Sequence, residues 1–400
     1  PTKDKLDSVF PDTPVALKRI DGHAAIFNQA AIKMAGVTES DRIDGGDLIL
    51  KDGKLTGVFI DKAQGLVYQH FPLESQDNVV NALMLAQDIC LENGLTTVDD
   101  AGLARASIEL IDSLHNSGDL KIRIYAMVSA DSAGLAHYLN SGIYKTDRLN
   151  VRSFKFYGDG ALGSRGALLR APYSDSPDKY GLLVTSLEDL NSTAERIANS
   201  EFQMNSHAIG DSANHTILET YKRVLQGKPD RRWKIEHAQV VSPEDFKYFD
   251  DIIPSIQPTH ATSDMYWAED RLGPERIKGA YAFKQLLEAN GRVALGTDFP
   301  VEQVSPFLTF YAAVARQDLE NYPEGGYQME NGLSREETLK GMTIWAAYSN
   351  FEENEKGSIE PGKFADFIIL DRDIMQVDIN EVPKTEVIQT YINGEPMLDE

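Results

Sequence analysis

Two histidines and an aspartate end three apolar runs of this sequence, and residues of these types bind divalent metal ions. Residues 202–207 and 233–237 end in His207 and His237, and residues 292–298 end in Asp298. A neutral imidazole is a good ligand for a borderline cation such as zinc, and a carboxylate can also accept a proton from a metal-activated water. We therefore expect these three residues to bind a metal, with Asp298 also acting as general base.

Each of these residues has a structural alternative. A histidine at a strand end commonly makes a structural hydrogen bond, and Asp298 could instead cap the N-terminus of a helix. The series favours the functional interpretation, because successive strands of an α/β barrel end at the same mouth and bring such side chains together.

Lys155 is a fourth candidate, since it lies between Phe154 and Phe156 in a predicted strand. Strand alternation directs both phenylalanines towards the outer helices and the lysine into the barrel. Burial lowers the pKa of an amine, which frees it to form either a carbamate that binds metal or a Schiff base with a carbonyl substrate. A structural lysine in a salt bridge is the alternative. We expect a metal ligand, and a Schiff-base lyase is the rival.

Three further residues are expected to contact a substrate. His260 follows the run that ends at Gln257, Arg165 closes a glycine-rich loop at residues 158–165, and His23 lies in Asp21-Gly-His. The loop lacks the Gly-Lys-Ser/Thr of a P-loop and the spacing of a dinucleotide fingerprint, so it is expected to shape the pocket.

The elements that must position these residues begin at about Gly94. From there, short apolar runs alternate with stretches of helical period, which is typical of repeated βα units. The predicted helices cover residues 107–115, 187–198, 213–225 behind a capping Asp211, and 275–287. The predicted strands cover residues 95–99, 121–127, 153–157, 202–207, 234–237, 252–257 and 293–298. This pattern predicts an α/β fold, a (β/α)8 TIM-type barrel whose first strand is missing.

The two ends of the chain differ from this pattern. Residues 24–35 and 78–91 predict helices on either side of a turn-rich segment at 41–57, so residues 1–93 are expected to be an insertion between barrel strands 1 and 2. Residues 365–371 and 387–393 alternate like strands. We expect a barrel over residues 1–356 and a small β-sandwich element over residues 357–400.

Composition narrows the partners. The net charge of -23, from 62 acidic and 39 basic residues, argues against nucleic acid or an anionic membrane surface. No apolar stretch has the length to span a bilayer, and the single Cys90 cannot form an internal disulfide. We therefore expect a small-molecule substrate and favour a cytoplasmic location, and a homo-oligomer stays open.

The motifs around these residues resemble a known family. The segments that carry the resemblance include Arg19-Ile-Asp-Gly-His23, Gly158-Asp-Gly-Ala-Leu-Gly-Ser164, Asn205-Ser-His-Ala-Ile-Gly-Asp211, Ile235-Glu-His-Ala-Gln239, Gly296-Thr-Asp298 and Gly357-Ser-Ile-Glu-Pro-Gly-Lys-Phe-Ala-Asp366. They span nearly the whole chain and are similar to the amidohydrolase superfamily, within it the amidohydrolase-3 group that includes N-substituted formamide deformylase.

The resemblance implies a metal-dependent hydrolase of non-peptide carbon-nitrogen bonds that uses one or two divalent ions, with zinc the expected metal. It matches Lys155 to a carboxylated lysine, His207 and His237 to ligands on barrel strands 5 and 6, and Asp298 to the strand-8 aspartate. The His-x-His pair of the family's first strand does not occur in the sequence. We therefore expect a truncated chain, and the alternative function is an impaired or inactive barrel that only binds a small molecule or needs its missing N-terminal part.

Overall fold

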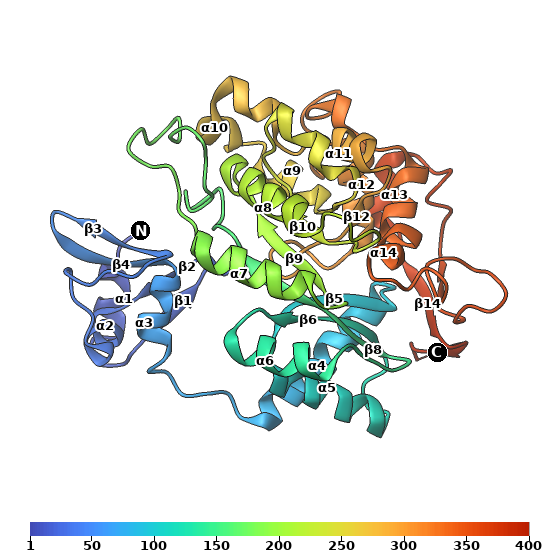
Figure 1. Ribbon diagram of the computed structural model, residues 1–400, viewed down its shortest axis with the longest axis horizontal. Helices are drawn as coiled ribbons and strands as arrows, with labels where there is room; N and C mark the ends of the chain where they lie inside the picture. Colours follow the sequence, from blue (N-terminus) through green and yellow to red (C-terminus); the bar gives the residue numbers. More distant parts are fainter. Residues whose placement is uncertain (400) are drawn as a thin grey trace.

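Seven parallel strands form a curved sheet at the centre of the computed structural model, which describes residues 1–399 (Figure 1). Their order is β12-β11-β10-β9-β8-β6-β5, and the short β7 pairs antiparallel with β8. All seven predicted runs are confirmed as strands of this sheet. The parallel strands are β5 Thr97–Leu103, β6 Arg123–Ser129, β8 Leu149–Tyr157, β9 Gln203–Ala208, β10 Lys234–His237, β11 Ile253–Ile256 and β12 Ala294–Leu295, and the antiparallel β7 covers Tyr144–Lys145.

Helices cover the outer face of this sheet and alternate with its strands, as a TIM-like fold requires (Figure 1). Phe154 and Phe202 meet beneath them, with ring centroids 5.0 Å apart and both side chains buried. The outward direction predicted for the phenylalanine before Lys155 therefore agrees with its packing. The covering helices include α5 Arg105–Ser117, α6 Ser132–Ser141, α7 Leu187–Ala198, α8 Asp211–Val224, α11 Phe283–Asn290, α12 Pro306–Ala315, α13 Arg335–Met342 and α14 Ile344–Ser349.

Two helix predictions need correction. Gly210, not Asp211, is the N-cap of α8, and the Asp211 carboxylate instead accepts a hydrogen bond from the Arg170 backbone N–H at 2.9 Å. The single helix predicted over residues 275–287 is wrong, because the chain forms α10 (Ala268–Arg276), a 3-10 turn η3 (Ile277–Gly279) and then α11. The interruption places Tyr281 at φ 53, where its backbone N–H bonds to the Gln239 carbonyl at 2.8 Å.

The N-terminal segment forms an antiparallel sheet of order β1-β2-β4-β3, which lies at one side of the barrel (Figure 1). The strands are β1 Ala16–Lys18, β2 Ala24–Phe27, β3 Gly46–Lys51 and β4 Lys54–Asp61, and the helices are α1 Asp4–Val9, α2 Gln29–Ala35 and α3 Gly65–Tyr68. It has its own core, in which Phe27 and Phe59 meet edge to face at 5.2 Å.

Two predictions for this segment are wrong in part. The helix predicted from residue 24 begins only at Gln29, since Ala24–Phe27 is strand β2. The turn-rich segment at 41–57 is mostly the hairpin of β3 and β4. Asp52 and Gly53 form its turn with φ values of 53° and 73°, the left-handed conformation that a tight hairpin requires.

The C-terminal tail forms a three-stranded antiparallel sheet of β13 (Phe367–Leu370), β14 (Val387–Ile392) and β15 (Glu395–Pro396). The predicted β element is therefore confirmed as one sheet. It packs beside the predicted long helix, now α4 (Gln76–Glu92), where the Thr390 hydroxyl donates to the Leu91 carbonyl at 2.7 Å. The domain boundaries predicted at residues 93 and 356 stay predictions.

Cys90 is buried as predicted, and burial raises the pKa of its thiol to about 11. Within residues 1–399, every helix is too short or too polar to cross a lipid bilayer.

Gly210 joins β9 to α8 so closely beneath the loop at Leu168 that an added Cβ would overlap the Leu168 backbone. We expect Gly210→Ala to lower the free energy of unfolding by about 1–3 kcal/mol, because backbone cannot move aside as a flexible side chain can. Urea denaturation measures this. The control is Gly65→Ala, where an added Cβ meets nothing within 4 Å and φ is -59. A change there as large as that at Gly210 would contradict the steric argument.

Candidate metal centre

His207 and His237 lie next to each other at the ends of two paired strands. β9 and β10 are parallel, with Glu236 opposite His207 and His237 opposite Ala208. The two imidazole centroids are 4.6 Å apart at an interplanar angle of 70°. Both side chains are buried, and this burial is the main cause that holds both pKa values well below the usual range. Both rings are therefore neutral, the form that binds a metal.

The hydrogen bonds of these two rings leave nitrogen atoms free. His237 Nδ1 is 2.7 Å from the Gln257 side-chain oxygen, which can only accept, so Nδ1 carries the proton and Nε2 does not. His207 Nε2 is completely buried with no hydrogen-bond partner, 3.5 Å from Asp159 Oδ1. A ligating histidine typically has one nitrogen oriented by a neighbouring oxygen, as His237 has here.

Lys155 lies on β8, the strand beside β9, and is 5% exposed. Its ammonium lies 5.1 Å from the centroid of the Tyr157 ring and, within residues 1–399, makes no hydrogen bond or ion pair. The alternative of a structural lysine in a salt bridge therefore finds no partner in the described chain. The lysine is also close enough for its charge to contribute to the lowered pKa values of His207 and His237.

Two more imidazoles extend the pair into a row. The His23 ring lies 5.0 Å from that of His207, and the His260 ring stacks on that of His237 at 5.9 Å and 21°. His260 Nε2 is buried without a hydrogen-bond partner. The structure therefore brings together the four histidines singled out in the sequence, which come from the N-terminal sheet, β9, β10 and α9 (Pro258–Asp264).

Asp298 lies at the end of this row, not at its centre. β12 ends at Leu295, shorter than the predicted run, and the Asp298 carboxylate is 3.9 Å from His260 Nε2 with 39% of its side chain exposed. Asp298 and His237 both adopt positive φ, 57° and 77°. Such backbone strain in non-glycine residues costs on the order of 1–3 kcal/mol and is concentrated at functional sites. The roles of Asp298 as metal ligand and general base stay predictions.

Arg165 is engaged elsewhere in this structure. Its guanidinium forms two hydrogen bonds with the Asp175 carboxylate, at 3.0 and 2.7 Å. This pairing raises the pKa of Arg165 and lowers that of Asp175. A substrate contact by Arg165 stays a prediction.

Two carboxylates that support the row of imidazoles were not predicted from the sequence. Asp159 is fully buried and accepts backbone N–H groups of Leu168, Ile209 and Gly210 at 2.8, 3.0 and 2.8 Å. It therefore ties the glycine-rich loop to the end of β9, although burial raises its pKa to about 7. Asp61 is the second, 2.6 Å from His23 Nδ1. The only signal for Asp159 was its place between two glycines.

The described side chains provide part of a metal site. Within residues 1–399, no three side chains of His, Cys, Asp or Glu converge in a way that could hold a metal ion. A catalytic zinc normally has three protein ligands. His207 and His237 supply two neutral imidazoles, one with an orphaned buried nitrogen, and Lys155 could supply an oxygen ligand as a carbamate. This donor set fits a divalent cation.

Asp264 is a buried acid near His260, and its raised pKa makes the stability of the fold depend on pH. Its carboxylate accepts hydrogen bonds from the Tyr281 hydroxyl at 2.8 Å and the Gln239 amide at 3.3 Å, and burial raises its pKa to about 6. Because the pKa in the unfolded chain is about 3.9, the folded state holds this proton more tightly. The stability that protonation contributes is present below about pH 4 and is lost as the pH rises through 6.

We therefore expect the wild type to lose up to about 3 kcal/mol relative to Asp264→Asn between pH 4 and pH 7. Urea denaturation of both proteins across this range measures the difference. A difference that stays constant with pH, or that grows in favour of the wild type, would show that folding does not raise the pKa of Asp264.

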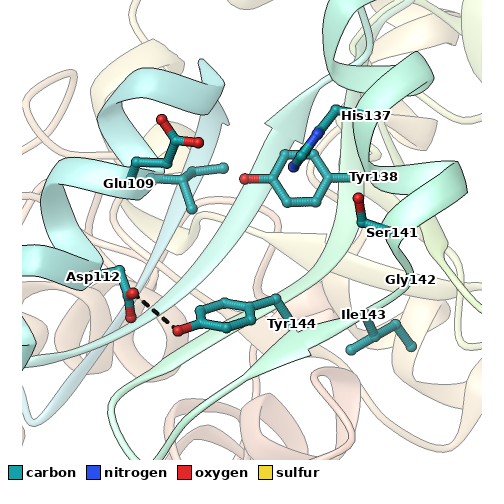
Figure 2. Close-up of a pocket in the computed structure, with 9 residues that line it drawn as sticks. Glu109, Asp112, His137, Tyr138, Ser141, Gly142, Ile143 and Tyr144 are labelled. Atoms are coloured by element: carbon teal, nitrogen blue, oxygen red, sulfur yellow. Dashed lines mark hydrogen bonds between the residues drawn. The ribbon is translucent and has the colours of Figure 1, made fainter.

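A separate cavity of about 280 Å³ lies on the outer wall of the barrel between α5 and α6 (Figure 2). The Tyr144 hydroxyl donates to Asp112 at 2.9 Å across it. None of the predicted site residues lines this cavity, so it is distinct from the histidine row. Its lining residues are Ile108, Glu109, Asp112, His137, Tyr138, Ser141, Gly142, Ile143 and Tyr144.

The chain belongs to the amidohydrolase family, whose model matches residues 1–397. It is 33% identical to the protein LONG AFTER FAR-RED 3 of Arabidopsis thaliana, covering 99% of this chain and 71% of that one. It is 32% identical to the putative amidohydrolase YtcJ of Bacillus subtilis, covering 98% and 76%. The N-substituted formamide deformylase of Arthrobacter pascens is 24% identical, with 98% and 75% covered.

A solved structure of another protein has a similar fold over most of this chain. The crystal structure of a metal-dependent hydrolase from Pyrococcus horikoshii superposes with a TM-score of 0.76 at 28% identity, covering 95% of this chain and 75% of that one. The chain is therefore a member of the amidohydrolase family with a TIM-like fold of seven parallel strands, and its relatives include metal-dependent hydrolases.

Proposed function

We propose that this protein hydrolyses amide or formamide-type carbon-nitrogen bonds of a small molecule, with a divalent metal, zinc, bound by His207, His237 and a carboxylated Lys155. The observation that supports this most is the pair of buried neutral imidazoles 4.6 Å apart on adjacent strands, beside a lysine without a partner. The similarity to an N-substituted formamide deformylase supports the substrate class.

When bound, zinc would polarise the substrate carbonyl and lower the pKa of water to roughly 7. The chain's own residues hold the rest of the site. Gln257 orients the His237 ring through Nδ1, and Asp159 keeps the glycine-rich loop against β9. Asp298, at the exposed end of the row, would accept a proton and pass it towards the leaving nitrogen. His23 and His260 flank the pair and would contact the substrate.

The test is hydrolysis of N-monosubstituted formamides by the purified chain, followed by formate release, after metal removal and after reconstitution with zinc and bicarbonate. We expect activity that requires both, since bicarbonate supplies the carbon dioxide for the lysine carbamate. No hydrolysis after reconstitution, with no metal retained, would reject the proposal.

The net charge of -23 argues against nucleic acid or an anionic membrane as the partner.

A second candidate is a barrel that binds a small molecule without hydrolysing it. The open edges of the parallel sheet at β5 and β12 favour it, as does the finding that within residues 1–399 no three His, Cys, Asp or Glu side chains could hold a metal ion. Under this candidate, calorimetry would detect binding of the formamide while no formate is released.

A further inference from the structure

The N-terminal sheet contributes a hydrogen-bonded pair, His23 and Asp61, to a site otherwise built by the barrel. His23 directly precedes β2 and Asp61 ends β4, and Nδ1 of the histidine is 2.6 Å from Oδ1 of the aspartate. The Asp61 side chain is 2% exposed and that of His23 is 17% exposed. The His23 ring in turn lies 5.0 Å from that of His207.

Two unfavourable features, and two glycines beside them, coincide at the Asp61 carboxylate. Asp61 adopts φ 48, and its Oδ2 is buried without a hydrogen-bond partner. The glycine-rich loop passes directly over this oxygen. A Cβ at Gly166 would lie 2.8 Å from Oδ2, and one at Gly160 would be closer still, so the two glycines leave room for the carboxylate where it lies. The fold thus keeps this carboxylate against His23 despite a strained backbone and an unpaired oxygen.

This pairing determines what His23 can offer. A carboxylate only accepts hydrogen bonds, so His23 Nδ1 carries the proton, and Nε2 is the acceptor in the neutral form of the ring. Among residues 1–399, no side chain or backbone group hydrogen-bonds to His23 Nε2. The ring therefore presents an unused acceptor next to His207, which suits a hydrogen-bond donor on the ligand.

We propose that Asp61 is a positioning residue that holds His23 in the Nδ1–H tautomer, so that Nε2 accepts a hydrogen bond from the substrate's amide N–H. This inference rests on the proposed function and narrows its substrates to amides and formamides with a single substituent on nitrogen. A tertiary amide has no N–H and would leave Nε2 unpaired. A site built to hydrogen-bond a donor discriminates strongly against the analogue that lacks it.

The test is Asp61→Asn, because an asparagine NH2 can donate to Nδ1 and so reverse the tautomer. NMR of the protein with 15N-labelled histidine should show His23 changing from Nδ1–H to Nε2–H. Hydrolysis of an N-monosubstituted formamide should fall by about 10- to 100-fold, as is typical when an orienting partner is lost. The N-methylated counterpart has no N–H to donate to Nε2, so its rate, which we expect to be slower in the wild type, should change by less than about 3-fold.

Asp47→Asn is the matched control, since Asp47 on the same sheet accepts a hydrogen bond from Lys179 at 2.7 Å and does not hydrogen-bond to His23. It should alter neither the tautomer nor the selectivity. An unchanged His23 tautomer in Asp61→Asn, or an equal fall for both substrates, would overturn the proposal. If the wild type hydrolyses neither substrate, the proposed function fails, whereas the NMR result still decides the role of Asp61.

If Asp61→Asn does not fold, His23→Gln gives the same test from the other partner. We expect its preference for the secondary over the tertiary formamide to fall by about 10-fold or more. An unchanged preference would overturn the proposal.

Discussion

Replacing His207 with alanine should abolish stabilisation of the protein by zinc and lower kcat/KM for formamide hydrolysis by more than about 100-fold. Loss of an outer partner of a metal ligand already costs about 10- to 100-fold, so loss of a ligand should cost more. A ligand that binds only the folded state at 100 times its Kd contributes about 2.7 kcal/mol, which appears as a higher Tm in zinc than in chelator. His207→Ala should show no such difference.

The control for this prediction is His70→Ala, because His70 is exposed and lies outside the row of imidazoles. It should keep both the zinc-dependent Tm and the activity. Each protein is compared with itself in zinc and in chelator. The loss of stability caused by the cavity at residue 207 is therefore the same in both conditions and does not affect the zinc-dependent change in Tm. If His207→Ala were stabilised by zinc as strongly as the wild type, His207 would not be a metal ligand.

The parallel strands were predictable because most of them, such as β6, β8, β9 and β10, are short apolar or β-branched runs that are buried on both faces. Residues of β9 such as Met204 and Asn205 are buried regardless of which face they occupy, so the run contrasts clearly with the amphipathic helices around it. The barrel mouth was predictable for the same reason. Once the strands are parallel, the histidines that end β9 and β10 must lie side by side, as their 4.6 Å separation confirms.

The N-terminal sheet was harder to predict, although its hairpin carried a signal. Leu50-Lys-Asp-Gly-Lys-Leu55 has an Asp-Gly turn between apolar residues, the strongest short hairpin pattern, but the polar residues around it suggested only turns. The helix expected over residues 275–287 failed for a different reason. Burial of Tyr281 and its hydrogen bond to Asp264 outweigh local helix propensity, and no pattern in the sequence reveals such a tertiary contact.

The supporting residues of the site could not be predicted at all from spacing. Asp61 and His23 are 38 residues apart and meet only because β2 pairs with β4. Gln257 likewise reaches His237 because β10 and β11 are neighbours in the sheet. Residues that bind a metal repeat at strand ends and can be read from a sequence, whereas the residues that orient them depend on which strands become neighbours.

The C-terminal sheet is attached to the barrel by a buried ion pair between Arg123 of β6 and Asp366. Their side chains are 2% and 3% exposed, and the guanidinium bonds both carboxylate oxygens at 2.6 and 3.0 Å. Arg123 also donates to the Asn393 side chain at 2.6 Å and stacks on Phe364 at 3.9 Å. Asp366 ends the motif at residues 357–366 that resembles the family, so a contact between the tail and the barrel accounts for that aspartate.

Asp366→Ala should therefore lower the free energy of unfolding by about 3–5 kcal/mol, since it leaves the Arg123 guanidinium buried without a counter-charge. That is a large share of the roughly 5–15 kcal/mol that stabilises a typical domain. Urea denaturation measures the loss, and Glu355→Ala is the control, because its partner Lys145 is 31% exposed and such surface pairs contribute about 0–1 kcal/mol.

Replacing both buried partners, as Arg123→Met with Asp366→Leu, should restore most of the stability, because the cost arises from the isolated charge and not from the lost attraction. A double variant as unstable as Asp366→Ala would instead mean that the pair's geometry, with Asn393 and Phe364, holds the tail in place.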